Sequence, residues 1–192
     1  QAVHAALQAR GIRHLEAPML GSRPQALSGE IFFIVAGDEA QLPVIAPLLE
    51  AMGKRHLYVG PSSTANRIKL IHNILGAVNA AAAAESLALC VQAGVDPEVY
   101  RQVVVEGSGM AYTTYFGKRV ERVLNGDYST QFSLELMHKD VSLAMDIARA
   151  TGTAVPILEA TLRAYAEGIE GGWRKDDFSA VTHVIEGKLG RP

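Results

Sequence analysis

The sequence predicts an α/β segment followed by an all-α segment. Strand-like runs occur only before residue 61, where they alternate with helical patterns. From residue 61 onward one helical pattern follows another, and the stretch 63–93 reads as a single long helix at the junction. We therefore predict one domain at residues 1–61 and a second, helical domain at residues 62–192.

The first 60 residues predict the order helix, strand, strand, helix, strand. The expected elements are an amphipathic helix at 1–10, a strand at 12–20 that runs into a loop at 21–29, a doubly covered apolar strand at 31–36, a helix at 39–52 and a strand at 56–59. Pro47 should kink the second helix or shift its start. The chain opens in mid-helix without an initiator methionine, so we expect it to begin inside a fold.

The long helix at 63–93 has clear boundaries. Ser62 or Ser63 can cap its start, and Gly94 stands where a left-handed C-terminal cap belongs. About thirty residues at 1.5 Å each span roughly 45 Å. Its alanine run at 80–84 allows other helices to approach closely.

Shorter helices follow, each with its own start or stop signal. Asp96 and Pro97 form a cap followed by proline, and Gly152 ends a clear amphipathic pattern. The expected helices lie at 98–106, 112–124, 134–150, 157–167 and 178–185.

Composition narrows the class of protein. With 18 Lys and Arg against 20 Asp and Glu, the net charge is -2, and no basic cluster with interleaved aromatic residues suits a nucleic acid. The single cysteine, Cys90, forms no intrachain disulfide, and we expect a reducing cytoplasm. We find no signal peptide and expect no membrane-spanning run, since Asn79 and Glu85 bound the alanine run.

Lys69 and Asn73 are the first candidate site residues. They stand four apart, so a helix presents the ammonium and the amide on one face. A partly buried lysine has a lowered pKa and can exchange a proton near neutral pH. On spacing alone the pair is more often a solvated helix face, but a position between two domains favours a functional cleft.

The stretch 16–29, E-A-P-M-L-G-S-R-P-Q-A-L-S-G, is the second candidate. Backbone N–H groups at Gly21 and Ser22, with the serine hydroxyl, can hold a carboxylate or a phosphate. An ordinary connection explains the stretch equally well.

The third candidate is the stretch 132–140, F-S-L-E-L-M-H-K-D. We expect Lys139 and Asp140 to point away from much of the apolar stripe, as a polar lip over a cleft or as a surface ion pair. His72 and His138 have no third ligand at a suggestive spacing, so no metal site is predicted.

These three stretches, in this order, resemble the β-hydroxyacid dehydrogenase family over nearly the whole chain. E-A-P-M-L-G-S looks like the family's substrate-binding motif, K-L-I-H-N like its catalytic K-x-x-x-N, and F-S-L-E-L-M-H-K-D-V-S-L-A like its C-terminal motif. The matches A-G-D, A-P-L-L-E-A-M-G-K and D-D-F-S-A-V are most similar to the glyoxylate/succinic semialdehyde reductase branch.

The resemblance implies the C-terminal part of a Rossmann domain, joined by the long helix to a 6-phosphogluconate dehydrogenase-like helical domain. It implies an oxidoreductase that moves a hydride between NAD or NADP and a small β-hydroxy acid or its aldehyde, of the 3-hydroxyisobutyrate, tartronate semialdehyde, glyoxylate or succinic semialdehyde type. It also implies a homodimer or homotetramer formed through the helical domain.

The resemblance assigns roles to residues. Lys69 would be the general acid and base, with Asn73 positioning the carbonyl oxygen. The substrate would contact Leu20, Gly21, Ser22, Asn73, Phe132 and Asp140, and the cofactor would contact Lys139 and Phe132.

Two departures from the family pattern are visible. Leu20 stands where the family usually has a serine that binds the substrate carboxylate, which favours an altered substrate. The chain contains no G-x-G-x-x-G, since the glycines at 107 and 109 follow a helix and not a strand. We therefore expect a fragment that lacks the glycine-rich half of the nucleotide-binding domain, and the choice between NADH and NADPH stays open.

Two other functions remain open at this point. A non-catalytic dimerisation or scaffold module would explain the absent glycine-rich half and Leu20. An imine reductase of the same superfamily is the other alternative, and retention of Lys69 argues against it.

Overall fold

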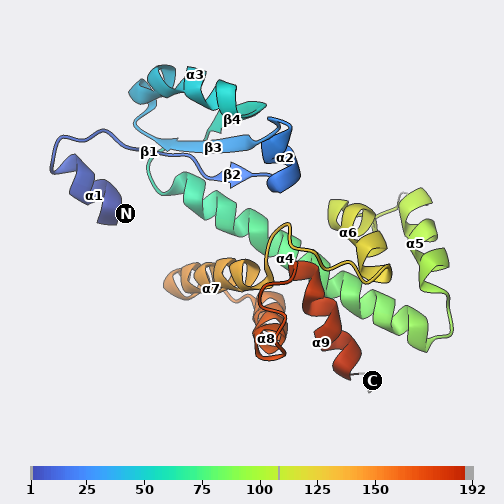
Figure 1. The fold of residues 1–192 in the computed structure, drawn as a ribbon. Coiled ribbons are helices and arrows are strands. Elements are labelled where there is room, and N and C mark those ends of the chain that lie inside the picture. The colour runs from blue at the N-terminus through green and yellow to red at the C-terminus, as the bar shows by residue number, and fades with distance from the viewer. Residues whose placement is uncertain (1, 108, 189–192) are drawn as a thin grey trace. The chain divides into compact units, whose positions relative to one another are not determined.

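The computed structural model describes residues 2–107 and 109–188, and the chain forms two compact units, residues 1–72 and residues 73–192. The first unit combines strands and helices and the second is helical (Figure 1). The predicted fold class, α/β followed by all-α, is confirmed. The two units meet in sequence inside the long helix α4 (Thr64–Gln92), while the predicted domain boundary after residue 61 stays a prediction.

The sheet of the first unit is built around β3 (Phe32–Gly37). The strands β1 (Leu15–Glu16) and β2 (Met19–Leu20) pair with it antiparallel, and β4 (Arg55–Tyr58) pairs with it parallel. The continuous strand expected at 12–20 is therefore wrong. Pro18 has no N–H to give to a ladder, and only its carbonyl bonds β3, accepting from Ile34 N–H at 2.9 Å.

Four helical segments accompany this sheet: α1 (Ala2–Gln8), α2 (Arg23–Leu27), the 3-10 turn η1 (Glu39–Gln41) and α3 (Leu42–Met52). The loop expected at 21–29 contains α2, because Ser22 and Gln25 form a reciprocal capping box and Pro24 suits a first turn. The α-helix expected from residue 39 starts at Leu42 and continues through Pro47. Leu49 of α3 packs with Phe33 in the core of the unit.

The helix α4 runs without interruption for 29 residues, as predicted for 63–93. Gly94 adopts φ +76° after its end, which confirms the predicted left-handed stop. At its start the carboxylate of Glu16, from β1, accepts hydrogen bonds from Ser63 N–H and Asn66 N–H, while the predicted cap by Ser62 or Ser63 stays a prediction. Ala65 packs with Ile34 in the first unit, and Leu87 packs with Phe116 in the second.

By length and composition, α4 is also apolar enough to cross a membrane, with a mean hydropathy of 1.7 over its best window. The expectation that no run in the chain meets this criterion was wrong. Part of that window, 39%, is buried against the rest of the protein, and the core helix of a water-soluble protein passes the same test. No other helix among the described residues passes it.

The second unit consists of the later turns of α4 and six further segments: α5 (Pro97–Glu106), α6 (Thr114–Leu124), α7 (Leu134–Thr151), α8 (Pro156–Glu170), the 3-10 turn η2 (Phe178–Ala180) and α9 (Val181–Lys188). The predicted cap Asp96 accepts from Glu98 N–H, and Gly152 ends α7 with φ +67°. Between α5 and α6, Ser108 lies outside the described residues.

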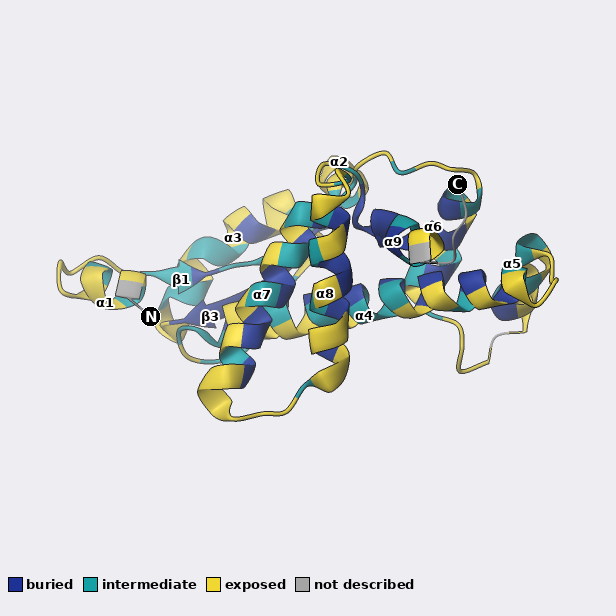
Figure 2. Cartoon of the chain, turned by 90° about the horizontal axis from the view of Figure 1, so that it is seen from below, coloured by how far each residue is buried: buried dark blue, intermediate teal, exposed yellow. Residues whose placement is uncertain are grey.

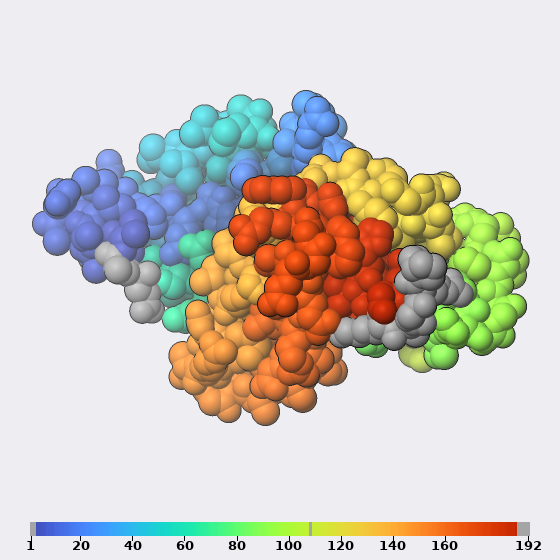
Figure 3. All heavy atoms as spheres, turned by 60° about the horizontal axis from the view of Figure 1, so that its bottom comes forward, coloured from blue at the N-terminus to red at the C-terminus, as the bar shows by residue number. Residues whose placement is uncertain are grey.

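Burial in the second unit follows the helix faces. Figure 2 shows buried stripes along the inner faces of α7 and α8, and Figure 3 shows these two helices side by side on one surface. Tyr165 of α8 and Leu134 of α7 are completely buried, so this helix pair contributes much of the core. The stretch that carries Lys139 and Asp140 is thereby held on a packed helix.

Candidate functional site

Lys69 and Asn73 both lie on α4, in its second and third turns. Lys69 is half-buried and belongs to the first unit, while Asn73 is buried and belongs to the second. The i, i+4 spacing on a continuous helix puts the two side chains on one face, as predicted. The placement of these two side chains on one face therefore depends only on the geometry of α4.

The start of α4 is capped by the carboxylate of Glu16, from strand β1. Its Oε1 accepts from Ser62 Oγ at 2.9 Å and from Ser63 N–H at 2.5 Å, and its Oε2 accepts from Asn66 N–H at 3.4 Å. Burial by itself raises the pKa of the Glu16 carboxyl, but these three hydrogen bonds outweigh it and the pKa is lowered. Glu16 is therefore an ionised cap, anchored in the sheet.

The segment with Leu20, Gly21 and Ser22 runs from the last residue of β2 to the start of α2 in the first unit. Leu20 packs against the small apolar cluster of Ile34 and Ala65, so its side chain takes part in the core. Both Ser22 N–H and Ser22 Oγ donate to Gln25 Oε1, at 2.9 and 3.0 Å. The two donors expected to hold a substrate carboxylate at Ser22 are thus already used within the capping box.

Asp140 joins two other predicted site residues inside the second unit. Asn73 Nδ2 donates to Asp140 Oδ2 and Lys139 Nζ donates to Asp140 Oδ1, both at 2.6 Å. The expectation that Asp140 points away from the apolar stripe was wrong: it stands three residues after Met137 and four before Ala144, both buried, and shares their face. Lys139 leaves that face, with 57% of its side chain exposed.

Phe132 is held in place by a second buried acid. Asp177 is completely buried, and its Oδ2 accepts from Phe132 N–H at 3.2 Å, from Gln131 N–H at 3.0 Å and from Arg119 Nη1 at 2.6 Å. Phe178 N–H donates back to the carbonyl of Phe132 at 2.9 Å. The backbone of Phe132 is therefore fixed on both sides.

Burial shifts the pKa values of two titratable side chains in the second unit, Tyr115 and His138. Burial, with Asp177 nearby, raises the pKa of the Tyr115 hydroxyl far above its usual range. Burial and the charge of Arg174 lower the pKa of His138, which keeps this imidazole neutral. Within the described ranges, no group of three or more His, Cys, Asp and Glu side chains is placed to hold a metal ion.

The structure thus groups the predicted residues in two sets. Lys69 and the segment 20–22 belong to the first unit. The second unit holds the others, and it brings Asn73, Asp140 and Lys139 into direct contact and fixes Phe132 separately.

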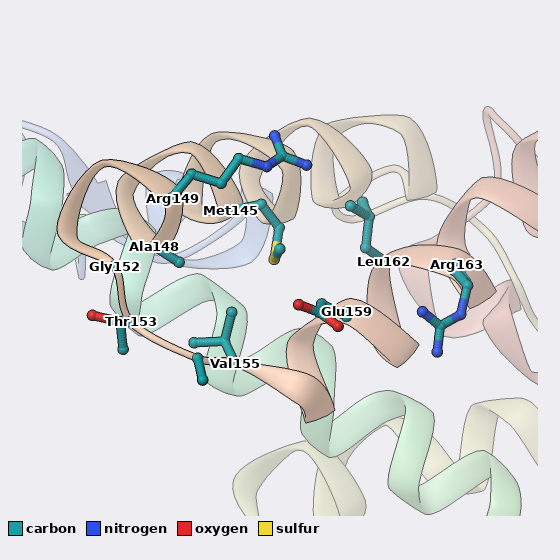
Figure 4. A pocket seen from close by; sticks show the side chains of 10 residues that line it. Met145, Ala148, Arg149, Gly152, Thr153, Val155, Glu159, Leu162 and Arg163 are labelled. Carbon is teal, nitrogen blue, oxygen red and sulfur yellow. The ribbon is translucent and has the colours of Figure 1, made fainter.

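The surface pockets among the described residues include two of similar volume, one in each unit. One, of about 430 Å³, is formed by the end of α7, the turn after it and the start of α8, with Met145, Val155 and Leu162 as its apolar side chains and Glu159 beside them (Figure 4). The other, of about 420 Å³, is in the first unit and has Glu16, His14 and Asn66 in its wall.

Sequence reasoning missed three residues with a part in this arrangement. Glu16 was read as part of a ligand-binding stretch, and its role as a cap joins residues 46 to 50 positions apart. Arg119 was not singled out, and Asp177 entered only as part of the match D-D-F-S-A-V. An acid just before a helix is also a natural partner for an arginine, which is the signal that could have found this pair.

Family models match both parts of the chain. The model for the NAD-binding domain of 6-phosphogluconate dehydrogenase matches residues 1–60, and the model for the NAD-binding domain of NADP-dependent 3-hydroxyisobutyrate dehydrogenase matches residues 63–185.

Similar proteins extend over nearly all of the chain. It is 30% identical over 188 residues to an L-threonate dehydrogenase of Escherichia coli, covering 97% of this chain and 62% of that protein. It is 31% identical over 194 residues to an NAD-dependent L-serine dehydrogenase of Pseudomonas aeruginosa, covering 98% of this chain and 65% of that one. The chain spans about three fifths of the length of these relatives.

The same fold is found in solved structures. A 3-hydroxyisobutyrate dehydrogenase from Salmonella typhimurium matches with a TM-score of 0.87 and 30% identity, over 96% of this chain and 64% of that chain. A 3-hydroxyisobutyrate dehydrogenase from Mycobacterium tuberculosis, solved with L-serine, matches with a TM-score of 0.86 and 29% identity, over 96% and 65%.

Proposed function

We propose, since this chain belongs to the β-hydroxyacid dehydrogenase family, that its protein transfers a hydride between NAD or NADP and a small β-hydroxy acid or its aldehyde. The observation that carries the proposal is the pairing on α4 of Lys69 with an Asn73 that is buried and fixed by Asp140. A proton donor beside an oriented amide is what reduction of a carbonyl requires of the protein.

In the proposed mechanism, Lys69 gives a proton to the carbonyl oxygen during reduction and takes it back during oxidation. Asn73 donates an amide hydrogen to Asp140, which fixes the plane of the amide on the helix face that it shares with Lys69, where it would help to position the substrate oxygen. Asp140 then acts through Asn73, as a positioning residue, because each of its oxygens already has a partner.

The nicotinamide cofactor supplies or accepts the hydride when it is bound. The residues of this chain fit such a group in part: the ammonium of Lys139 is exposed and suits an anionic group, and Phe132 offers a fixed aromatic ring. The sequence holds no G-x-G-x-x-G turn, so these residues do not by themselves form a pyrophosphate cradle.

The substrate is proposed to be a short carboxylic acid of the 3-hydroxyisobutyrate, tartronate semialdehyde, glyoxylate or succinic semialdehyde type. Leu20 offers no hydroxyl, and the donors of Ser22 are engaged by Gln25. The carboxylate must therefore displace Gln25 or bind other donors. Relatives named for L-threonate and L-serine support small polar acids as the class.

We further propose a homodimer or homotetramer, formed through the helical unit. In that unit α4 exposes Leu75 and Leu89 by 62% and 71% of their surface, which is unusual for leucines on an otherwise packed helix. Leu89→Glu should convert the oligomer to a monomer in sedimentation equilibrium. A cytoplasmic location is proposed from composition alone, with Cys90 as a free, buried thiol.

The test of the main proposal is Lys69→Ala in the full polypeptide that contains this sequence. Loss of the proton donor should lower kcat about 10²- to 10⁴-fold with either nicotinamide cofactor and the four candidate aldehydes or acids. Lys118→Ala, on α6, is the matched control and should keep wild-type turnover. Near-normal turnover of the Lys69 variant would refute the assigned role.

A non-catalytic scaffold remains the second candidate, favoured by the engaged donors at Ser22 and by the core position of Leu20. Fluorescence titration of the folded 192-residue chain with NADH and with NADPH separates the two. Binding in the micromolar range means that these residues complete a site, alone or across a dimer. Absence of binding to this chain, with turnover by the full polypeptide, assigns the cofactor site to residues outside this sequence.

A further inference from the structure

We infer that Glu16 is a positioning residue of the proposed reaction: its buried carboxylate fixes the first turn of α4 to the sheet and so sets where Lys69 lies. The inference rests on the function proposed for Lys69. Glu16, the acid of the E-A-P stretch, would then hold the helix in place and would not itself contact the substrate.

The carboxylate of Glu16 is held on both sides, by the sheet and by the start of α4. Glu16 is 8% exposed, and its backbone pairs with Ala36 of β3, so the carboxylate projects from a strand of the sheet. Its two oxygens accept three hydrogen bonds, from Ser62 Oγ, Ser63 N–H and Asn66 N–H. Both oxygens are engaged, which leaves this carboxylate as a fixed structural acceptor.

The backbone is strained at the start of α4. Ser63 adopts φ +79°, the only positive φ among the described residues other than glycine. This left-handed conformation costs a serine about 1 kcal/mol or more, and it persists only where surrounding contacts hold it. The hydrogen bond from Ser63 N–H to Glu16 is such a contact. The chain thus turns sharply from β4 into α4 at the residue that Glu16 binds.

Lys69 lies close along the helix to the residues that Glu16 holds. Asn66, the last residue held by Glu16, stands one helical turn before Lys69, and all these residues belong to the first unit. A helix transmits a shift of its first turn to the next turn with little loss, since consecutive turns share their hydrogen bonds. Misplacing a catalytic group by about 1 Å can cost as much as 10²-fold in rate.

The segment 20–22 touches the start of α4 through Leu20 and Ala65, but its backbone is held by other contacts. Leu20 pairs with Phe32 across β2 and β3, and Ser22 is held by its own capping box with Gln25. Loss of the Glu16 carboxylate should therefore move Lys69 more than this candidate substrate segment, which keeps its strand pairing and its capping box. The expected signature is a fall in kcat with little change in KM.

The experiment compares Glu16→Gln with Glu50→Gln, an exposed glutamate on α3, in the full polypeptide. The neutral amide turns a donor toward one of the helix N–H groups, so hydrogen exchange should quicken at residues 63–67 and not in β3. We expect kcat to fall about tenfold with KM within about twofold, well inside the loss that misplacement can produce. Glu16→Asp, which keeps the charge and both acceptors, should recover most of the turnover.

Ser62→Ala is a milder variant that removes one of the three hydrogen bonds and decides the case if Glu16→Gln fails to fold. It should quicken exchange at residues 63–67 and lower kcat about two- to threefold. Exchange and kcat like those of Glu50→Gln, or a rise in KM without a fall in kcat, would overturn the inference. The exchange result needs no turnover, so retained activity in Lys69→Ala would defeat the proposed reaction while leaving the anchor itself established.

Discussion

The two units each bury a carboxylate, but they satisfy it differently. Glu16 in the first unit is held by a hydroxyl and two backbone N–H groups at a helix start. Asp177 in the second unit is held by the guanidinium of Arg119 together with backbone N–H groups, and it is completely buried. Removal of Glu16 leaves neutral hydrogen-bond donors without their acceptor. Removal of Asp177 leaves the positive charge of Arg119 without its partner, in a side chain that is only 13% exposed. The type of partner, as well as the burial of the acid, sets what each unit loses.

Asp177→Ala should produce the largest loss of stability. It leaves Arg119 uncompensated and frees the backbone of Phe132, at an expected cost of about 3–5 kcal/mol. Urea unfolding followed by Trp173, the single tryptophan, reports on this unit. Asp146→Ala breaks an exposed ion pair with Arg149 and should cost less than about 1 kcal/mol. Equal losses in the two variants would remove the distinction drawn between buried and exposed pairs.

Asp140→Ala should have an intermediate effect. Asn73 keeps a buried amide hydrogen without its acceptor, while the ammonium of Lys139 returns to water, so we expect a loss of about 1–3 kcal/mol. The matched control is Lys139→Ala, which breaks the exposed half of the same cluster and should cost at most about 1 kcal/mol. Trp173 fluorescence in urea measures both. A larger loss of stability in the Lys139 variant would show that the ion pair of Asp140 with Lys139 contributes more to stability than its hydrogen bond with the Asn73 amide.

Local signals were enough to predict much of this molecule. The long helix, its stop at Gly94, the cap at Asp96 and the stop at Gly152 all depend on residues adjacent in the sequence, and the structure confirms them. The buried central strand followed equally from an unbroken apolar run. Of the candidate site, the shared face of Lys69 and Asn73 followed from helical spacing alone.

The same local signals could not predict contacts between residues that are far apart in the sequence. The cap of α4 comes from Glu16, and the anchor of Phe132 comes from Asp177, each 45 or more positions away. The short helix α2 was missed because the glycines and serines on either side of it, and Pro24 within it, are also typical of a loop. Asp140 was placed on the wrong face because its charge was given more weight than its spacing from Met137 and Ala144.

The smallest predicted effect concerns pH and the acid of the first unit. The pKa of Glu16 is lowered in the folded protein, so its charge stabilises the fold fully above the pKa of the unfolded chain, about 4.3, and this contribution disappears as pH falls through the folded pKa. The free energy of unfolding of the wild type should exceed that of Glu16→Gln by about 1 kcal/mol at pH 6, and this difference should shrink progressively below pH 4. Urea unfolding followed by circular dichroism from pH 3 to pH 7 measures the difference. Glu50→Gln, on the exposed face of α3, serves as the control and should show no such narrowing. A difference that instead grows toward low pH would mean that burial, and not the three hydrogen bonds, governs this carboxyl, and the contrast with Asp177 would then rest on burial alone.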